Sequence, residues 1–389
     1  MLQNCDIAII GGGPVGAALA LALRDSGLHI TLLEARPASE ASTDPRALAL
    51  SYGSRLLLSK LGVWQNLAQV SAIQTIHISQ KNSFGRTQLK AAELNVPDLG
   101  YVLPYTNLQN TLQNALQQSA VQLLQGAVVS ALTHEDNSAE IRYRHNGTEQ
   151  TLQAKLVVVA DGGKLLENSH PPEIVEYGQS ALIAHVTCSE PKISTAFERF
   201  TAQGPLALLP YQNGYELVWT APHAALENML QWDDATLLAQ LHQQFGDRVG
   251  NFLSLGARSC FPLRLKRAPA ITLPHTVLIG NAAQTLHPVA GQGFNMGLRD
   301  AWELSQLILN TCASECDSEL GNEAMLANYS QTRRIDRTAG IHFTDGLVRL
   351  FSNDLPLISP ARAATLSLLD CLPGMKKFVA KRMMFGLNG

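Results

Sequence analysis

The sequence has no Cys-x-x-Cys pair and therefore lacks the usual spacing of zinc ligands or redox dithiols. Its six cysteines are scattered along 389 residues, which is typical of single thiols in a reducing compartment. Cys312 and Cys316 are one helical turn apart, but no histidine stands near them. We interpret this pair as an ordinary helix surface and predict no metal site.

Excess charge and long apolar runs are also absent. The formal net charge is only -3 and neither end carries a charged tail, so nucleic acid is not an expected partner. No apolar run reaches the roughly 18 residues of a membrane span. The N-terminal apolar segment lacks the basic region and cleavage site of a signal peptide. With 46% hydrophobic residues, the chain is expected to be a globular, cytoplasmic enzyme-sized protein.

A glycine-rich loop follows the first apolar strand, residues 5–10. Gly11, Gly13 and Gly16 form Gly-x-Gly-x-x-Gly directly before an alanine- and leucine-rich helix. In such a loop the first glycine makes a tight turn, the second admits a pyrophosphate, and the third lets helix and strand pack closely. A second strand ends at Glu34, where a carboxylate accepts ribose hydroxyl groups. These features predict an adenine dinucleotide site and leave FAD and NAD open.

A second strand, loop and helix begins with the apolar run at 275–279, but its glycines have a different spacing. Pro288 and Gly291 fix a bend, and Gly293 lets the backbone approach a flat ligand. The following helix points its N-terminal N–H groups at that ligand, where they stabilise the negative charge of a reduced flavin. Asn281 is placed to bind a ribityl or phosphate group. Two such loops in one domain favour an extended FAD over NAD.

The segment from His287 to Asp300, HPVAGQGFNMGLRD, resembles the signature of the ubiquinone-biosynthesis monooxygenases, which have a p-hydroxybenzoate hydroxylase-like fold. GGGPVG, DPRALALS, VVVADG and AFERFTAQGPLALLP extend the resemblance over nearly the whole chain. Two departures stand out. Asn281 occupies a position where the family usually has aspartate. Asp161 and Gly162 are not followed by the family's serine and arginine, which puts the part of the motif linked to pyridine-nucleotide docking in doubt.

The resemblance implies a FAD-dependent hydroxylase with NADH or NADPH as transient electron donor and O2 as co-substrate. It further implies that a flavin C4a-hydroperoxide hydroxylates a polyprenylated (methoxy)phenol. A non-catalytic flavin-binding scaffold in a biosynthetic complex, or a flavin oxidase or dehydrogenase on the same fold, remain alternatives. Other ubiquinone-biosynthesis proteins are expected partners. The basic, apolar C-terminal segment, which contains Lys377 and Lys381, suggests peripheral contact with the inner face of the membrane; a docked helix with a solvated face is the alternative.

The resemblance also implies roles for individual residues. The cofactor-binding set comprises Gly11, Gly13, Gly16, Glu34, Arg46, Val129, Asp161, Gly162, Asn281, Pro288, Gly291, Gly293 and Asn295. Within it, Arg46 and Asp161 are assigned to the pyrophosphate and ribityl region, although Arg46 also fits a surface arginine. His287 is a candidate proton donor, with a structural histidine in the Pro288 turn as the alternative. Tyr211 and Trp219 are candidate pocket residues, with core packing as the alternative.

The expected fold class is α/β, a Rossmann-like FAD-binding domain with an inserted, mostly antiparallel substrate sheet and C-terminal helices. The expected boundaries are 1–73, 101–177 and 263–340 for the FAD-binding domain, 74–100 and 178–262 for the substrate domain, and 341–389 for the C-terminal region. Helices are expected near 107–119, 235–245, 294–312, 322–340, 342–352, 359–370 and 373–384.

Overall fold

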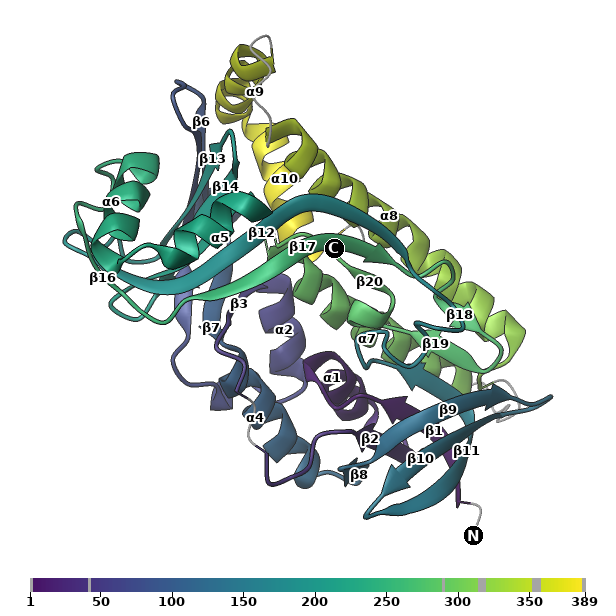
Figure 1. Ribbon diagram of the computed structural model, residues 1–389. Coiled ribbons are helices and arrows are strands. Elements are labelled where there is room, and N and C mark those ends of the chain that lie inside the picture. Colours follow the sequence, from purple (N-terminus) through teal and green to yellow (C-terminus); the bar gives the residue numbers. More distant parts are fainter. Residues whose placement is uncertain (1–2, 41–42, 289–290, 314–319, 352–357, 387–389) are drawn as a thin grey trace.

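A computed structural model describes residues 3–40, 43–288, 291–313, 320–351 and 358–386 (Figure 1). An eight-stranded sheet forms the half of the molecule that holds the N-terminus, in the order β18-β19-β11-β1-β2-β8, with β10 and β9 beside β11. Its strands are β1 (Gln3–Ile10), β2 (Ile30–Glu34), β8 (Gln122–Gln125), β9 (Val128–His134), β10 (Ala139–His145), β11 (Thr148–Val159), β18 (Thr272–Leu273) and β19 (Thr276–Leu278).

Five consecutive strands of this sheet, β19, β11, β1, β2 and β8, run parallel. The cores of β1, β2 and β11 read as continuous apolar runs because both faces of the sheet are covered there. Helix α1 (Pro14–Leu23) packs against α4 (Tyr105–Gln117) and α7 (Gln292–Ala313). The leucines of α4 at 108, 112 and 116 are all buried, as their spacing of four predicts. Parallel strands place the loops that follow β1, β11 and β19 at one edge.

A nine-stranded sheet forms the other half, in the order β20-β17-β12-β15-β14-β13-β5-β6, with β16 beside β12. All of its pairings are antiparallel except that of β13 with β5. Its strands are β5 (Thr75–Gln80), β6 (Arg86–Lys90), β12 (Glu173–Cys188), β13 (Thr195–Thr201), β14 (Gly204–Tyr211), β15 (Gly214–Pro222), β16 (Phe252–Leu255), β17 (Ser259–Arg267) and β20 (Gln284–Thr285). The first long strand of this insertion starts before the expected boundary at 178, and β17 runs past 262.

The nine-stranded sheet has two covered faces. Helices α5 (His223–Gln231) and α6 (Asp234–Phe245) cover one face and build a core with it. The other face meets a three-stranded sheet made of β3 (Ala47–Ser51), β4 (Ser71–Ile73) and β7 (Gly100–Pro104). Helix α2 (Tyr52–Lys60) follows β3 directly, and the small sheet packs between the two halves. The arrangement confirms the predicted α/β fold with an inserted, mostly antiparallel sheet.

The C-terminal part is helical. Figure 1 shows α8 (Glu323–Phe351) running along both halves, followed by α9 (Ile358–Cys371) and α10 (Pro373–Phe385). The predicted break between 340 and 342 is wrong, because α8 is one helix of 29 residues. A Cβ atom on Gly340 would come within 2.1 Å of Met296 Cε on α7, so this glycine permits close helix packing and does not end the helix.

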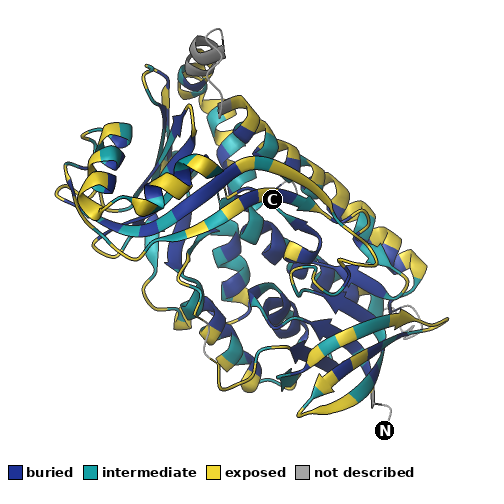
Figure 2. Cartoon of the chain, in the orientation of Figure 1, coloured by how far each residue is buried: buried dark blue, intermediate teal, exposed yellow. Residues whose placement is uncertain are grey.

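Burial follows this layering. Figure 2 shows the parallel strands at the centre of the eight-stranded sheet as buried, whereas β9, β10 and the outward side of α8 carry exposed residues. Short helices complete the chain: α3 (Ala91–Leu94) and the 3-10 turns η1 (Trp64–Asn66) and η2 (Gly280–Ala282). Among the described residues no helix has the length and apolar character needed to cross a bilayer. Cys316, part of the predicted helix-surface pair, lies outside the described residues.

Candidate active site

The glycines of the first loop have two different roles: two of them allow close packing, and one leaves open space for a ligand. Gly11 has φ +109°, and a Cβ there would come within 2.6 Å of the Ala160 carbonyl oxygen. A Cβ on Gly16 would come within 2.1 Å of the Gly11 carbonyl oxygen. Both are therefore fixed by the packing of α1 on β1 and β11. Around the Cβ position of Gly13, no described atom lies within 4 Å. This open side is where a pyrophosphate can approach the N-terminus of α1.

Glu34 holds this loop from the end of β2. Its Oε2 accepts the Gly12 N–H at 2.7 Å, and its Oε1 accepts the Arg36 N–H at 2.9 Å. Each carboxylate oxygen retains capacity for a second donor such as a ribose hydroxyl. A Cβ on Gly12 would lie 2.8 Å from Glu34 Oε2, so the glycine is required there. The sequence prediction missed Gly12 because it lies between two motif glycines.

Gln109 is a second residue that the sequence prediction missed. It is completely buried on α4, and its Nε2 donates to the Gly12 carbonyl oxygen at 2.8 Å. Its Oε1 is buried and has no hydrogen-bond partner within the described part of the chain. A buried acceptor beside the loop fits a ligand donor. The sequence feature that could have identified Gln109 is its position next to Leu108, on the face of α4 that the leucine spacing assigns to the core.

The turn after β11 is closed by Asp161. Its carboxylate accepts the N–H groups of Gly163 and Leu165, each at 2.8 Å. Gly162 has a positive φ of 83° and has open space around its Cβ position. Asn281 is exposed in the η2 turn, and it lines a small cavity together with Gly162 and Gly163. The structure thus brings the Asp-Gly motif and Asn281 together; their contacts with a cofactor stay predictions.

The second glycine loop is fixed by Asn295 on α7. Its Oδ1 accepts the Ser51 N–H at 2.8 Å and the Ser54 hydroxyl at 2.7 Å, while its Nδ2 donates to the carbonyls of Ala49 and Gly291. These four bonds use the whole capacity of the amide. The side chain of Asn295 therefore holds the loop, and a contact between the loop and the cofactor stays a prediction.

The other residues of the second glycine loop lie around the four hydrogen bonds of Asn295. Gly291 has φ +61°, and a Cβ there would lie 3.0 Å from Ala49 Cβ on β3. The Gly291 N–H donates to the Pro288 carbonyl at 2.9 Å, which closes the bend predicted from the sequence. Gly293 lies in the first turn of α7. Residues 289–290 lie outside the described residues.

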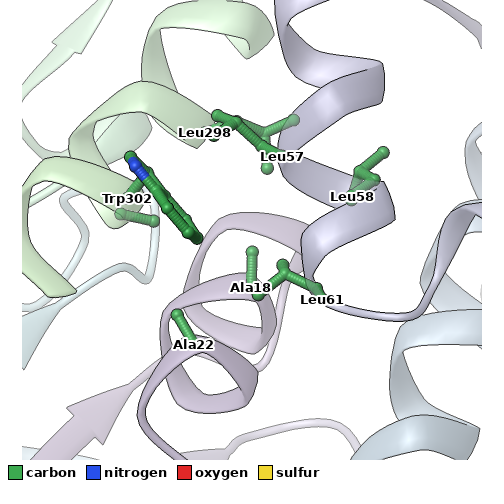
Figure 3. Close-up of a pocket in the computed structure, with 8 residues that line it drawn as sticks. Ala18, Ala22, Leu57, Leu58, Leu61, Leu298 and Trp302 are labelled. Atoms are coloured by element: carbon green, nitrogen blue, oxygen red, sulfur yellow. The ribbon is translucent and has the colours of Figure 1, made fainter. Parts of the chain in front are cut away.

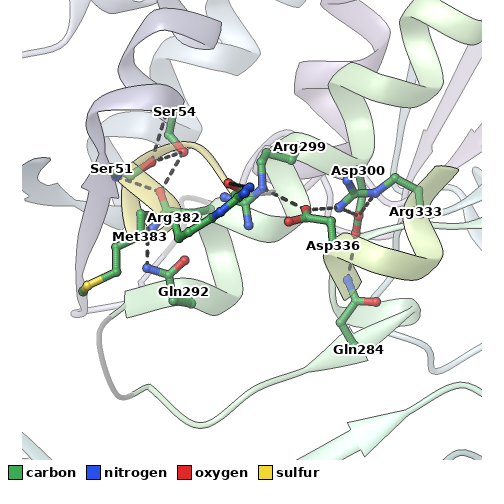
Figure 4. A network of polar contacts seen from close by, with 12 residues as sticks. Ser51, Ser54, Gln284, Gln292, Arg299, Asp300, Arg333, Asp336, Arg382 and Met383 are labelled. Carbon is green, nitrogen blue, oxygen red and sulfur yellow. Dashed lines mark hydrogen bonds and ion pairs between the residues drawn. The ribbon is translucent and has the colours of Figure 1, made fainter. Parts of the chain in front are cut away.

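A buried ion-pair network underlies the second loop (Figure 4). Asp300 Oδ2 accepts the Gly280 N–H at 3.0 Å and the Gln284 amide at 2.8 Å. Asp300 Oδ1 accepts two hydrogen bonds from Arg333. Arg333 also pairs with Asp336 at 3.0 Å. Asp300 therefore ties the turn after β19, strand β20 and helix α8 to helix α7.

His287 is buried directly before Pro288, with 1% of its surface exposed. Burial lowers the pKa of its imidazole to about 4. Its ring meets the Tyr177 ring edge to face, with centroids 5.4 Å apart. The ring is thus neutral near pH 7, which favours the structural alternative over a cationic proton donor. Pro288 itself is exposed.

Arg46 and Val129 lie on opposite sides of the site. The Arg46 guanidinium is paired with Asp44, with Nε 2.8 Å from Oδ1, and it lies over the Phe261 ring of β17 at 5.2 Å. Arg46 is thus held where the two halves meet, and its contact with a pyrophosphate stays a prediction. Val129 follows Ala127, whose N–H donates to the Glu34 carbonyl at 2.9 Å. This places Val129 on the strand beside the ADP half of the site.

Tyr211 and Trp219 face opposite sides of the nine-stranded sheet. Trp219 is 3% exposed and belongs to the core that includes Leu226 and Met229 of α5. Its predicted role in lining a substrate pocket is therefore wrong. Tyr211 is half-buried on the other face, with its ring 5.7 Å from that of His185. This face is turned towards β3, which the second glycine loop contacts.

An apolar pocket lies among α1, α2 and α7 and is drawn in Figure 3. Its lining comprises Ala18, Ala22, Leu57, Leu58, Leu61, Leu298, Ala301 and Trp302. This lining contains no carboxylate, hydroxyl or amide side chain with which to orient a ligand. We therefore interpret it as a packing gap between three helices, separate from the site at the strand ends.

The fold and the two loops at the strand ends are those expected of a flavoprotein monooxygenase, with one loop predicted for each half of FAD. The chain belongs to the FAD binding domain family, whose model matches residues 4–341. It is 34% identical over 395 residues to uncharacterized protein slr1300 of Synechocystis sp., covering 99% of this chain and 94% of that protein. It is 32% identical over 371 residues to 3-demethoxyubiquinol 3-hydroxylase of Escherichia coli, covering 91% and 92% respectively.

A solved structure shares the architecture. The p-nitrophenol 4-monooxygenase PnpA from Pseudomonas putida superposes with a TM-score of 0.81 at 15% identity, covering 99% of this chain and all of that one. At this identity the likeness concerns the fold. Together, the family and its relatives confirm FAD as the cofactor and FAD-dependent monooxygenase as the enzyme class. NADH or NADPH and O2 are the usual co-substrates of this class.

Proposed function

We propose that this protein hydroxylates a polyprenylated (methoxy)phenol in ubiquinone biosynthesis. The observation that carries the proposal is similarity over nearly the full chain to proteins named for this chemistry. One is the Escherichia coli enzyme, and another is the ubiquinone hydroxylase UbiL of Rhodospirillum rubrum, which is 30% identical over 388 residues. The two loops at the strand ends support the proposal, because they fit the two halves of FAD. Bound FAD supplies electron transfer from a nicotinamide and the activation of O2.

The chain's own residues position the cofactor in this proposal. Gly13 offers an open approach to the N-terminus of α1 for the pyrophosphate, while Glu34 and Gln109 present acceptors to the ribose. The N-terminus of α7 lies behind the second loop and stabilises negative charge there. Asn295 and Asp300 hold this loop in shape through buried hydrogen bonds. The protein thereby fixes the flavin against the apolar face that carries Tyr211.

Direct assay of oxygen transfer tests the proposal. FAD-loaded protein, a short-chain prenylated methoxyphenol and NADH or NADPH are mixed under 18O2, and the product is identified by mass spectrometry. We expect one 18O atom in the ring. Nicotinamide oxidation that yields only hydrogen peroxide indicates an oxidase. A yellow protein that the nicotinamide does not bleach indicates a scaffold.

The C-terminal helices support a second proposal, that the protein docks peripherally on the inner face of the membrane. Four large apolar side chains are exposed on α9 and α10, which we call the C-terminal apolar patch: Leu368, Leu372, Met375 and Phe378. Lys377 and Lys381 are exposed beside them, and Arg382 lies 5.0 Å from the Phe378 ring. Apolar side chains flanked by cations fit an anionic lipid surface. A polyprenylated substrate is itself dissolved in the membrane, so docking there brings the enzyme to it.

A further inference from the structure

The face of the nine-stranded sheet that β3 covers carries a carboxyl group, Glu198, that takes part in none of the contacts described above. Glu198 lies in the middle of β13. Its neighbours in sequence point to the opposite face: Phe197 packs 5.3 Å from Phe245, and Arg199 Nε donates to the Gln244 carbonyl of α6 at 2.7 Å. Because side chains alternate along a strand, Glu198 points away from α6.

The surroundings of Glu198 are apolar. Its register partners are Ala207 on β14 and Ile78 on β5, and Ala196 and Phe200 are its neighbours along the same face. No hydrogen bond or ion pair joins its carboxylate to any described residue, and burial alone raises its pKa to about 7. Protein surrounds this side chain, yet part of its surface remains accessible. Glu198 is thus a half-buried carboxylate on the face of the sheet that β3 covers.

The second glycine loop lies beyond one end of this face. Two residues further along the face, Leu209 on β14 pairs with Glu216 on β15, and the Glu216 carboxylate accepts the Ala47 N–H of β3. The same strand β3 carries Ala49, which contacts both Gly291 and Asn295. On the other side, Phe200 and Ile78 pack against α8 and α9, which lie across this end of the sheet in Figure 1. Glu198 therefore lies between the second glycine loop and the C-terminal helices α8 and α9.

Resting on the proposed function, we propose that Glu198 is a catalytic residue that binds the phenolic hydroxyl of the substrate and accepts its proton. The phenolic O–H bond breaks, a new O–H bond forms on the carboxylate, and the electron pair stays on the phenol oxygen. The resulting phenolate donates electron density to the ring carbon that is attacked by electrophilic oxygen. Glu198 then returns the proton to the product or to solvent, so the group is unchanged after one turnover.

Other titratable groups near this face already have partners or lie further away. Glu216 accepts the Ala47 N–H, and burial raises its pKa to about 7 as well, so Glu216→Gln shows which of the two carboxylates the pH dependence follows. His185 lies beyond Glu216 on β12. The helices that pack over Phe200 carry Asp345, which pairs with Arg349, and Asp370, which pairs with Lys376. Glu198 thus stands apart from every ion pair described on these elements, and its protonation follows the substrate and the pH.

Glu198→Gln tests the proposal, with Glu198→Asp as the conservative variant and Glu216→Gln as the matched control on the same face. For Glu198→Gln in the FAD-loaded protein, we expect roughly 10²-fold slower hydroxylation, the lower end of general-base effects. We expect the wild-type rate to rise as the pH increases through about 7, and we expect this rise to be lost in Glu198→Gln. Glu198→Asp should retain part of the rate and the rise, and Glu216→Gln should keep both.

A binding measurement gives a readout independent of turnover. A prenylated phenol bound to the wild-type protein at pH 8 should show the red-shifted near-ultraviolet absorption of a phenol whose hydroxyl donates to a carboxylate, and bound to Glu198→Gln it should lack this shift. The same red shift and an unchanged pH profile in Glu198→Gln overturn the assignment, as does transfer of the effect to Glu216→Gln. If wild-type protein forms no hydroxylated phenol, the proposed function fails instead, and the two failures are thereby distinguished.

Discussion

Arg333 donates two hydrogen bonds to a single oxygen of Asp300, from Nε at 2.9 Å and from Nη2 at 2.6 Å, and the two side chains are 1% and 2% exposed. The second oxygen of Asp300 is occupied by Gly280 and Gln284. Asp300, the last residue of the segment HPVAGQGFNMGLRD, is therefore buried beneath the second glycine loop and holds the elements around it together.

Replacing Arg333 with methionine should destabilise the protein by about 3–5 kcal/mol, because Asp300 and Asp336 are then left as buried charges without their cation. The measurement is urea-induced unfolding. Arg349→Met is the control, because Arg349 is 66% exposed in its pair with Asp345 and such surface pairs contribute little to stability. Equal losses in the two variants would contradict the role assigned to the buried pair.

Alanine at two glycines should separate cofactor binding from folding. Gly13→Ala meets no described atom within 4 Å, so the FAD-free protein should unfold within about 1 kcal/mol of wild type. The added methyl group faces the expected pyrophosphate, so FAD affinity should fall at least about tenfold, or about 1.4 kcal/mol.

Gly16→Ala serves as the contrast to Gly13→Ala. Its methyl group would come within 2.1 Å of the Gly11 carbonyl oxygen, so the FAD-free protein itself should lose about 1–3 kcal/mol or more. Fluorescence titration with FAD and urea unfolding without FAD measure the two quantities. Normal FAD affinity in Gly13→Ala would show that the pyrophosphate does not lie at this loop.

His287 predicts a loss of stability in mild acid. Its imidazole has a pKa of about 4 in the folded protein and 6.5 in the unfolded chain, so below pH 6.5 the unfolded chain takes up the proton first. The full free energy of unfolding is present above pH 6.5 and falls as the pH decreases, by up to about 3 kcal/mol near pH 4.

The measurement for His287 is urea unfolding at several pH values, for wild type and for His287→Gln, which has no proton to gain. As the pH falls from 6.5 to 4, the wild-type protein should lose more of its free energy of unfolding than His287→Gln does. The exposed His170, replaced in the same way, is the comparison. A pH-independent difference between wild type and His287→Gln would be incompatible with a buried neutral ring.

The C-terminal apolar patch predicts binding to anionic vesicles. Met375→Ser with Phe378→Ser removes side chains that are 55% and 58% exposed, so vesicle binding should weaken at least about tenfold. Sedimentation with phosphatidylglycerol vesicles measures this, and phosphatidylcholine vesicles report the share due to Lys377 and Lys381. Leu253→Ser on β16, another exposed apolar side chain, is the control. Equal binding by all variants would exclude the patch as the docking surface.

Local patterns were enough to predict the glycine loop, Glu34 and the leucine spacing of α4, because each depends on residues close together in sequence. The face of β15 was not predictable in this way. Alternation places Trp219 and Glu216 on opposite sides, but only pairing with distant strands decides which side meets β3. Gly340 was misread as a helix end for the same reason, because Met296 on another helix determines its role. Gln109 gains its importance from Gly12, which lies 97 residues away in the chain.

The bond between the Ser51 N–H and Asn295 spans 244 residues, and this distance matters while the chain is being made. A nascent chain that has emerged only as far as the nine-stranded sheet already contains the whole ADP half of the site, but it cannot yet close the clamp on the second loop. Such long-range contacts form slowly and late. We therefore expect stable uptake of the cofactor to follow synthesis of α7. Before that step α8 and α9 have not been made either, so the apolar residues Phe200 and Ile78 beside Glu198 are not yet covered and are open to chaperones.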